Sequence, residues 1–259
     1  MNFVFDLDGT ICFKGKPVSE TILECLDQLK NDGHDITFAS ARPIRDMLPV
    51  LHERFHSYKL IGGNGSLISK NGNVKEAKAF SRQQIKNILS IIEHHKATYL
   101  IDGNWDYAYT GPQGHPILNM VDPSRFAKCV PVTDLNTIVK ILILTAENMN
   151  MVEREMRDLD IVIHRHGDES VLDISPENVH KWSALKCLGV EENAFVAFGN
   201  DANDVTMFQK AAHSVMIGYH NELTPYATES VSLKGNYESK IVDKIKELVS
   251  PHSQSEVKS

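Results

Sequence analysis

Short apolar runs that end abruptly in polar or glycine residues recur along the chain. Runs of this kind, without alternating polar positions, are typical of strands that are buried on both faces, as in a parallel sheet covered by helices. The pattern predicts five such strands, at residues 2–5, 36–39, 60–61, 194–198 and 215–217.

Amphipathic segments with helical spacing lie between these runs. In the first of them Ile22, Leu23, Leu26 and Leu29 share one face, and Ser19 is the expected N-cap. The spacing predicts helices at residues 19–30, 46–55, 204–212 and 238–249. Alternating strands and helices at both ends of the chain indicate an α/β fold with a Rossmann-like, doubly wound parallel-sheet core.

The middle of the chain is richer in strands. A long helix is expected at 81–96, and then strands and one further helix at 99–101, 107–109, 138–144, 148–158 (the helix), 160–164 and 171–174. About a hundred residues is an ordinary domain size. We therefore expect an inserted α/β cap domain at 80–180 and a catalytic core formed by 1–79 plus 181–259.

Composition narrows the classes of function. The 259 residues include 42% hydrophobic residues and carry a net charge of -7, which disfavours nucleic acid and anionic membranes as partners. The start MNFVFD does not have the pattern of a signal peptide, and the apolar runs are too short to cross a bilayer. The four cysteines are far apart, without a CxxC pair. These features predict a cytoplasmic protein with reduced thiols.

The motif DLDGT at residues 6–10 directly follows the first predicted strand. Residues two apart in an extended segment can point the same way, so the carboxylates of Asp6 and Asp8 can face one site. Two close carboxylates repel each other unless one is protonated or a cation lies between them, and Mg2+ is the usual cation. Gly9 permits a sharp turn. An acidic loop that only caps a strand is the less favoured alternative.

The segment GNDAND at residues 199–204 follows another predicted strand. It can bring further carboxylates to the same edge of the sheet. Asn203 and Asp204 also precede a predicted helix, so N-capping explains them equally well when the segment is taken alone. Together with DLDGT, the segment favours a site.

DLDGT, Ser40 in FASAR, Lys181 and GNDAND resemble, in this order, the four motifs of the haloacid dehalogenase (HAD) superfamily. The insertion between Ser40 and Lys181 resembles the cap of the Cof-type (subfamily IIB) phosphatases. The phrases IGGNGSLI, LDISPENVHKWSAL and NDVTMF resemble that subgroup too.

The resemblance implies hydrolysis of phosphate esters through an aspartyl-phosphate. Asp6 would be the nucleophile, and Asp8 would protonate the leaving oxygen and then activate water. Ser40 would bind a phosphoryl oxygen. Lys181 would offset developing charge and hold Asp6 in place. Mg2+ would bridge Asp6, the backbone carbonyl of Asp8 and the late acidic loop.

One departure from the family pattern concerns the metal. The superfamily usually has Gly-Asp-x-x-Asn-Asp, so the usual metal-binding aspartate falls on Asn200 here, and Asp201 lies one place later. Asn200 is the expected positional ligand, Asp201 the alternative, and Asp204 a carboxylate that orients the ligand or Lys181. A neutral amide adds no charge, so the affinity for Mg2+ is expected to be lower.

Three further residues are expected to contact the substrate. Arg42 continues a Ser-x-Arg pattern that resembles the Thr-x-Arg of Cof-type enzymes, and a guanidinium can clamp phosphate or sugar oxygens. Asn203 is also expected to bind the substrate or its phosphate. Asn64 lies in a glycine-rich turn, where asparagine is also common for conformational reasons, and the two explanations stay open.

The sequence therefore predicts a Mg2+-dependent phosphatase that acts on small phosphorylated metabolites, with sugar phosphates suggested by the resemblance. A catalytically weakened ligand-binding or regulatory protein on the same fold is the alternative, motivated by Asn200. A phospho-signalling receiver is disfavoured because it would be about half as long and have no cap. The oligomeric state is not indicated by the sequence.

Overall fold

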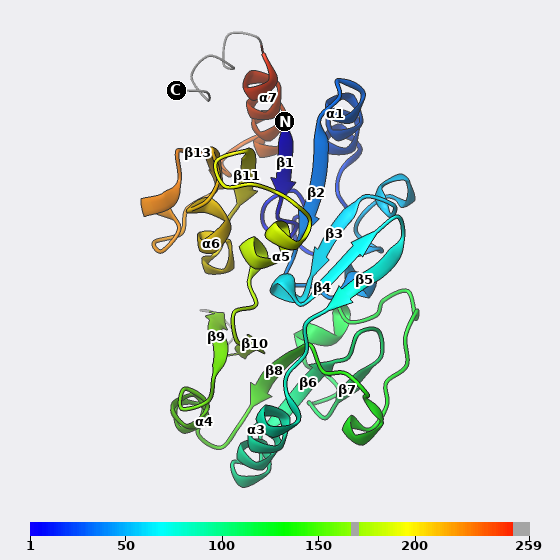
Figure 1. The fold of residues 1–259 in the computed structure, drawn as a ribbon, viewed down its shortest axis with the longest axis vertical. Coiled ribbons are helices and arrows are strands. Elements are labelled where there is room, and N and C mark those ends of the chain that lie inside the picture. Colours follow the sequence, from blue (N-terminus) through cyan, green and yellow to red (C-terminus); the bar gives the residue numbers. More distant parts are fainter. Residues whose placement is uncertain (167–170, 251–259) are drawn as a thin grey trace.

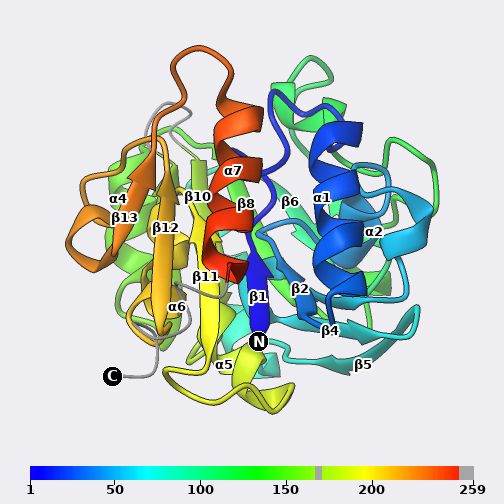
Figure 2. The same ribbon diagram turned by 90° about the horizontal axis from the view of Figure 1, so that it is seen from above.

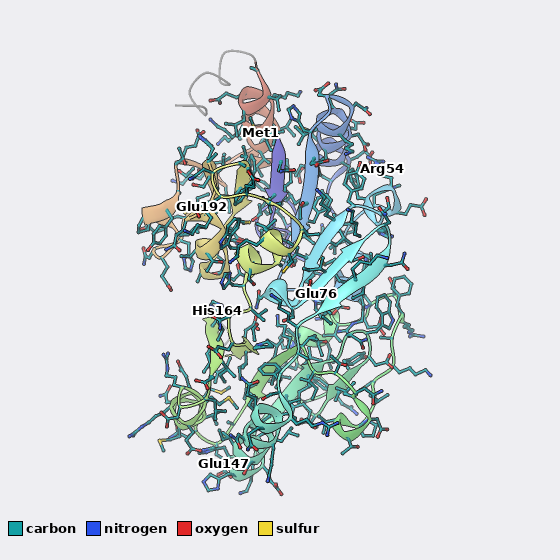
Figure 3. The ribbon with its side chains drawn as sticks, in the orientation of Figure 1. Met1, Arg54, Glu76, Glu147, His164 and Glu192 are labelled. Carbon is teal, nitrogen blue, oxygen red and sulfur yellow. The ribbon has the colours of Figure 1, made fainter. Side chains whose placement is uncertain are left out.

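The computed structural model describes residues 1–166 and 171–250. Its strands form two sheets, one of eight strands and one of five, which lie in separate layers along the long axis of the molecule (Figure 1). We call the layer of the eight-stranded sheet the core and that of the five-stranded sheet the cap. Figure 3 shows Met1 at the outer end of the core and Glu147 at the outer end of the cap.

The core sheet has the order β13-β12-β11-β1-β2-β3-β4-β5, and its first six strands in this order are parallel. The last two turn back as an antiparallel hairpin. Its strands are β1 (Asn2–Phe5), β2 (Asp35–Ala39), β3 (Lys59–Gly62), β4 (Leu67–Lys70), β5 (Asn73–Ala77), β11 (Phe195–Gly199), β12 (His213–Ile217) and β13 (Glu229–Val231).

Helices cover both faces of the core sheet. Alternate side chains of β1 point to opposite faces: Phe3 and Phe5 pack with α1 and α7, whereas Val4 packs with α5 and α6. Figure 2 shows α1 and α7 on one side of β1. These helices are α1 (Glu20–Asn31), α5 (Lys181–Cys187), α6 (Val205–Phe208) and α7 (Tyr237–Val249). The predicted α/β fold with a doubly wound core is confirmed.

The cap sheet has the order β7-β6-β8-β10-β9, and all its neighbours are antiparallel. Its strands are β6 (Thr98–Asp102), β7 (Tyr107–Tyr109), β8 (Lys140–Thr145), β9 (Ile161–His166) and β10 (Val171–Pro176). The helices α3 (Arg82–His94) and α4 (Met149–Met156) pack on one face of this sheet through a separate apolar cluster. The other face is turned toward the core.

Two predicted helices are shorter than expected. The segment 46–55 contains only the end of α2 (Ile44–Met47) and a 3-10 turn, η1 (Glu53–Phe55), because Pro49 has no backbone N–H to continue the helical hydrogen bonds after Leu48. In place of 204–212, a 3-10 turn, η5 (Ala202–Asp204), leads into the four-residue α6.

Other differences concern caps and the hairpin. Ser19 lies at the N-cap of α1 but its side chain makes no capping hydrogen bond. Ser81, in contrast, forms a full capping box with Gln84 at the start of α3. The hairpin of β4 and β5 was not predicted, because every residue of β5 is exposed and no apolar run marks it.

The remaining short elements are 3-10 turns: η2 (Gly63–Gly65), η3 (Pro116–Asn119), η4 (Val132–Asp134) and η6 (Thr224–Tyr226). Within residues 1–166 and 171–250, no helix combines the length and the apolar composition that crossing a bilayer requires.

Candidate active site

The predicted site residues lie at one edge of the core sheet. Asp6, Ser40 and Asn200 directly follow β1, β2 and β11, and Asn64 lies in the turn after β3. The carboxyl ends of neighbouring parallel strands meet at the same edge, which is why segments far apart in the sequence converge here. This edge faces the cap, and the heads of the β1 and β2 arrows point toward it in Figure 1.

A buried ammonium group joins two carboxylates at the bottom of the site. Lys181 Nζ donates to Asp6 Oδ1 at 2.6 Å and to Asp204 Oδ1 at 2.7 Å. Lys181 and Asp204 are fully buried and Asp6 is 4% exposed. Burial raises the pKa of Asp6 to about 7 although Lys181 opposes this shift. The two carboxylates outweigh burial for Lys181 and raise its pKa, so it stays an ammonium.

Asp204 also fixes the loop that carries the late acidic motif. Its Oδ2 accepts hydrogen bonds from the backbone N–H groups of Asn200, at 2.8 Å, and Asp201, at 3.1 Å. Gly199 is required at this turn because a Cβ there would lie 2.6 Å from the Asp204 carboxyl carbon. Asp204 therefore positions both Lys181 and the backbone next to Asp6.

The amide of Asn200 lies against three oxygens of the DLDGT loop. One of its two terminal atoms is 3.1 Å from Asp6 Oδ2, 2.9 Å from the Asp8 carbonyl oxygen and 3.2 Å from Thr10 Oγ1. Turned with Nδ2 toward them, the amide donates hydrogen bonds; turned with Oδ1 toward them, it completes a cluster of oxygens that needs a cation. Gly9 permits this approach, since a Cβ there would lie 2.2 Å from Asn200 Nδ2.

This cluster fits the donor preferences of Mg2+. Neighbouring oxygens that share an octahedral Mg2+ at about 2.1 Å stand about 3 Å apart. The separations from the Asn200 amide to Asp6 and to the Asp8 carbonyl, 3.1 and 2.9 Å, match this spacing. A carboxylate, an amide and a carbonyl oxygen are all hard ligands of the kind that Mg2+ takes.

Asp201, the alternative ligand, is turned another way. Its Oδ1 accepts from the Ala202 backbone N–H at 2.7 Å and lies 3.2 Å from His220 Nε2. Its side chain borders the same cavity as Asp6 and Asp8, but it is the Asn200 amide that lies within 3.1 Å of Asp6 Oδ2 and the Asp8 carbonyl oxygen. The geometry therefore favours Asn200 over Asp201 as the residue that faces the cation position.

The carboxylate of Asp8 binds the guanidinium of Arg42. Arg42 Nε and Nη2 donate to Asp8 Oδ2 and Oδ1, both at 2.6 Å, in a bidentate pair. The Asp8 side chain is 44% exposed, whereas that of Arg42 is 9% exposed. A planar guanidinium bound in this way occupies both carboxylate oxygens, so the Asp8 carboxyl can face a substrate oxygen only when Arg42 moves away.

Ser40 lies beside these groups and is 1% exposed. Its Oγ accepts from the Arg42 backbone N–H at 3.1 Å, and its hydroxyl borders the same cavity. A hydroxyl in this place has a proton to offer to a phosphoryl oxygen.

The two asparagines expected to meet substrate form a chain that leads into the cap. Asn203 Nδ2 donates to Asn64 Oδ1 at 3.2 Å, and Asn64 Nδ2 donates to Asp173 Oδ2 at 3.1 Å. Asp173 is on β10 and forms an ion pair of 2.9 Å with Lys140 of β8. Asn203 borders the cavity; Asn64 is 2% exposed and does not, so its contacts here are structural.

Sequence reasoning missed several residues of this site. Thr10 donates to Asp6 Oδ2 at 2.8 Å and is fully buried. Lys140 donates to the Ala41 carbonyl oxygen at 2.7 Å, which ties the cap to the core. Lys140 and Asp173 each interrupt an otherwise apolar strand, and this interruption was the signal that could have marked them. Arg45 and Asp102 form a similar buried pair, with Nη2 2.5 Å from Oδ1.

The core and the cap together enclose a cavity of about 270 Å3 over Asp6. Asp6, Asp8, Ser40 and Arg42 line it from the core. Eight of the described residues line it from the cap: Leu100, Asp102, Ile117, Met120, Val121, Lys140, Leu142 and Val171.

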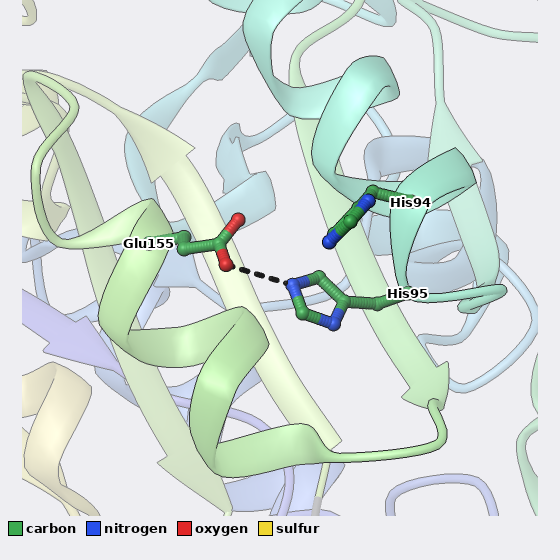
Figure 4. Close-up of side chains that lie close together, drawn as sticks. All are labelled: His94, His95 and Glu155. Carbon is green, nitrogen blue, oxygen red and sulfur yellow. Dashed lines mark hydrogen bonds and ion pairs between the residues drawn. The ribbon is translucent and has the colours of Figure 1, made fainter.

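Another group of potential metal ligands lies on the helical side of the cap. His94 and His95 at the end of α3 meet Glu155 of α4, and His95 Nε2 is 3.0 Å from Glu155 Oε1 (Figure 4). This contact links the two helices. None of the three residues lines the cavity.

The sequence model of one family, described as haloacid dehalogenase-like hydrolase, matches residues 3–236. The chain belongs to this family. The fold is similar to that of a solved structure, the HAD subclass IIB sugar phosphatase BT4131, which has a TM-score of 0.78 and 16% identity over 95% of this chain and 98% of that one.

Other relatives agree with this assignment. The 5-amino-6-(5-phospho-D-ribitylamino)uracil phosphatase YitU of Bacillus subtilis is 21% identical over 82% of this chain and 84% of that protein. An HMP-PP phosphatase of Yersinia enterocolitica is 24% identical over 83% and 82%. The solved structure of TM0651 from Thermotoga maritima has a TM-score of 0.77 and 19% identity, covering 96% of this chain and 97% of that one.

Proposed function

We propose that this protein is a Mg2+-dependent phosphatase that hydrolyses small phosphorylated metabolites through an aspartyl-phosphate at Asp6. The observation that carries the proposal is the placement of Asp6: its carboxylate lies at the bottom of a cavity, between the ammonium of Lys181 and the oxygen cluster around Asn200. Curated relatives named as phosphatases support the reaction type.

The chain's own residues account for formation of the intermediate. An Asp6 oxygen attacks phosphorus as the bond to the ester oxygen breaks, and Asp8 gives its proton to that leaving oxygen. Ser40 donates to a phosphoryl oxygen. Lys181 holds Asp6 in position and offsets negative charge that develops near it.

Arg42 controls when Asp8 can act as an acid. In the structure Asp8 is the bound partner of Arg42. A substrate phosphate competes for the same bidentate donors, and once Arg42 has turned toward it, the Asp8 carboxyl is free to face the leaving oxygen. In the second step Asp8 takes a proton from water, whose oxygen attacks phosphorus and releases inorganic phosphate and Asp6.

Asp6, the Asp8 carbonyl and Asn200 would hold Mg2+, and Asp204 would position Asn200 through its backbone N–H. The bound ion supplies charge neutralisation and alignment of the phosphoryl group. With two neutral ligands and one carboxylate, we expect the affinity to be modest.

The leaving group is less closely defined. BT4131 is titled a sugar phosphatase, whereas the name of YitU specifies a phosphoribityl derivative of uracil. Sugar phosphates, suggested by the family resemblance, therefore stay one prediction among others, and the choice depends on the cap residues that face Asp6.

Phosphate release tests the proposal. The panel contains p-nitrophenyl phosphate, sugar phosphates and aromatic phosphate esters, each with Mg2+ or EDTA, for the wild type and Asp6→Asn. We expect turnover that requires Mg2+ and disappears in Asp6→Asn. A folded wild type that binds these esters without turning over any of them would favour the ligand-binding alternative, and turnover retained by Asp6→Asn would refute the site.

A further inference from the structure

We propose that the preferred substrate is the phosphate ester of an alcohol that carries an aromatic ring, and that the apolar wall of the cap selects this ring over a sugar. The inference rests on the proposed phosphatase function and specifies its leaving group. We use "apolar wall" for Leu100, Ile117, Met120, Val121, Leu142 and Val171.

The apolar wall is the part of the cavity that lies opposite the catalytic residues. Six of the eight cap residues that line the cavity belong to it, and the other two are Asp102 and Lys140. Leu100, Val121, Leu142 and Val171 are also members of one contiguous apolar cluster, with Ile117 packed against it. A leaving group attached to a phosphate at Asp6 therefore meets a continuous apolar surface.

The register of the cap sheet explains why this surface is apolar. Leu100 of β6 lies opposite Leu142 of β8, and Asp102 lies opposite Lys140 one step nearer the core. Side chains two apart share a face, so the face that looks toward Asp6 has charged residues beside the core and leucines farther out. The charged row makes the junction with the core, and the leucines meet the leaving group.

The charged side chains that border the cavity are bound to protein partners. Asp102 is paired with Arg45 at 2.5 Å, and Lys140 with Asp173 at 2.9 Å and the Ala41 carbonyl at 2.7 Å. The hydroxyls of a sugar would lose water in this cavity. Among the described cap residues that line it, the six of the apolar wall have no polar side chain, and Asp102 and Lys140 are already paired. Buried hydroxyls without partners disfavour binding.

An aromatic ring matches the mouth of the cavity better than an alkyl group does. Met120 Sδ lies 4.0 Å from Arg42 Nη2, so a thioether and a guanidinium stand side by side there. Both make favourable contacts with aromatic rings, the guanidinium by stacking and the sulfur at the ring edge. A flat ring can also lie along the face of the sheet with few rotatable bonds to order.

The test compares esters of primary alcohols, so that the leaving oxygens are chemically alike. We expect kcat/KM for 2-phenylethyl phosphate to exceed that for glucose 6-phosphate by about tenfold or more, with 2-cyclohexylethyl phosphate between them. Affinities of the three esters for Asp6→Asn, measured by calorimetry with Mg2+, should follow the same order even if turnover is slow.

A matched pair of variants assigns the preference to the wall. Leu142 and Leu144 lie on the same face of β8 and both are buried, but only Leu142 lines the cavity. Leu142→Thr should reduce the preference for the phenyl ester several-fold, whereas Leu144→Thr, with the same loss of apolar volume, should retain it. Melting temperatures establish that both variants are folded.

The outcomes separate this inference from the proposed function. A phosphatase that prefers glucose 6-phosphate, or whose preference is equally reduced by both threonine variants, would overturn the apolar wall as the selecting surface. Equal use of the phenyl and cyclohexyl esters would overturn the aromatic part. Tighter binding of the phenyl ester without any turnover would support the wall and refute the phosphatase.

Discussion

Asn200 is the residue at which this chain departs most from its family pattern, and the structure suggests what the departure does. The amide lies within 3.1 Å of Asp6 Oδ2 and 2.9 Å of the Asp8 carbonyl oxygen. With Nδ2 toward these oxygens it satisfies them in the absence of a cation, which an aspartate could not do without being protonated. We therefore expect the amide to stabilise the metal-free site and to lower the affinity for Mg2+.

Exchanging this amide for a carboxylate should strengthen metal binding. We predict that Asn200→Asp lowers the half-saturating Mg2+ concentration roughly tenfold, because a second anion then faces the cation position. This concentration is measured by titration with Mg2+, followed both by phosphate release and by the rise in melting temperature. Asp201→Asn is the control, with an expected change below about threefold, because Asp201 faces His220. A larger effect at Asp201 would assign the ligand to that residue.

The ionisation of Asp6 should make the stability of the metal-free protein depend on pH. Its pKa is raised to about 7 in the fold, from 3.8 in a model peptide, so the folded state holds the proton more tightly than the unfolded state. The stabilisation from this proton is complete below about pH 4 and is lost as the pH rises through about 7.

Denaturant unfolding in EDTA checks this sign. The free energy of unfolding of the wild type, relative to that of Asp6→Asn, should fall between about pH 5 and pH 8. At the higher pH, excess Mg2+ should raise the free energy of unfolding of the wild type but not that of Asp6→Asn. A difference that stays constant or grows with pH would show that burial does not raise the pKa of Asp6.

At the scale of elements, the short helix α2 does more than connect strands, because it carries a buried arginine to the cap. Arg45 is 1% exposed and binds Asp46 beside it, Asp102 at the end of β6 and the Trp105 carbonyl oxygen. Its guanidinium also lies 4.8 Å from the ring centre of Tyr107. These contacts hold one end of the cap sheet against the core.

Removal of this guanidinium should destabilise the protein strongly. We predict that Arg45→Met lowers the free energy of unfolding by about 3–5 kcal/mol, because Asp46 and Asp102 are left as buried, unpaired carboxylates. Arg54→Met, which removes a partly exposed arginine paired with Glu20 and Asp27, should destabilise the protein far less. If the two variants unfold alike, the buried pair does not hold the cap and core together.

The elements that were predictable from sequence are those whose burial leaves a pattern. β11 and the buried part of β1 after Asn2 have no polar side chain because both faces are covered, and α1 and α7 have one apolar face because one side is covered. β5 is wholly exposed and leaves no such pattern. Its pairing with β4 follows from the hairpin turn, which hydrophobic periodicity does not detect.

At the scale of the whole molecule, the site is divided between two layers that differ in how far the sequence specifies them. Asp6, Ser40, Lys181 and Asp204 each lie in a short motif at a strand end or helix start, so motif order predicts which residues meet. Lys140 and Asp173 meet through the register of β8 and β10. Register depends on tertiary packing and is not visible in a single sequence.

The contacts between the layers show why the cap is part of the site. Ser66 Oγ of the core donates to the Val139 carbonyl oxygen of the cap at 2.8 Å. Lys140 Nζ of the cap donates to the Ala41 carbonyl oxygen of the core at 2.7 Å. Each layer therefore donates a hydrogen bond to the backbone of the other. The carboxylates of Asp6 and Asp8 come from the core, and the apolar side chains of the apolar wall come from the cap.

The measurement that tests the central claim most directly is chemical trapping of the intermediate. The enzyme is mixed with Mg2+ and a phosphate ester labelled at phosphorus, quenched in acid within a single turnover, digested and mapped by mass spectrometry. We predict a phosphoryl group on the N-terminal peptide, at Asp6, that hydroxylamine removes and that is absent in Asp6→Asn. Turnover with the label on another residue, or with no trapped phosphoryl group at any quench time, would contradict the assignment of Asp6 as the nucleophile.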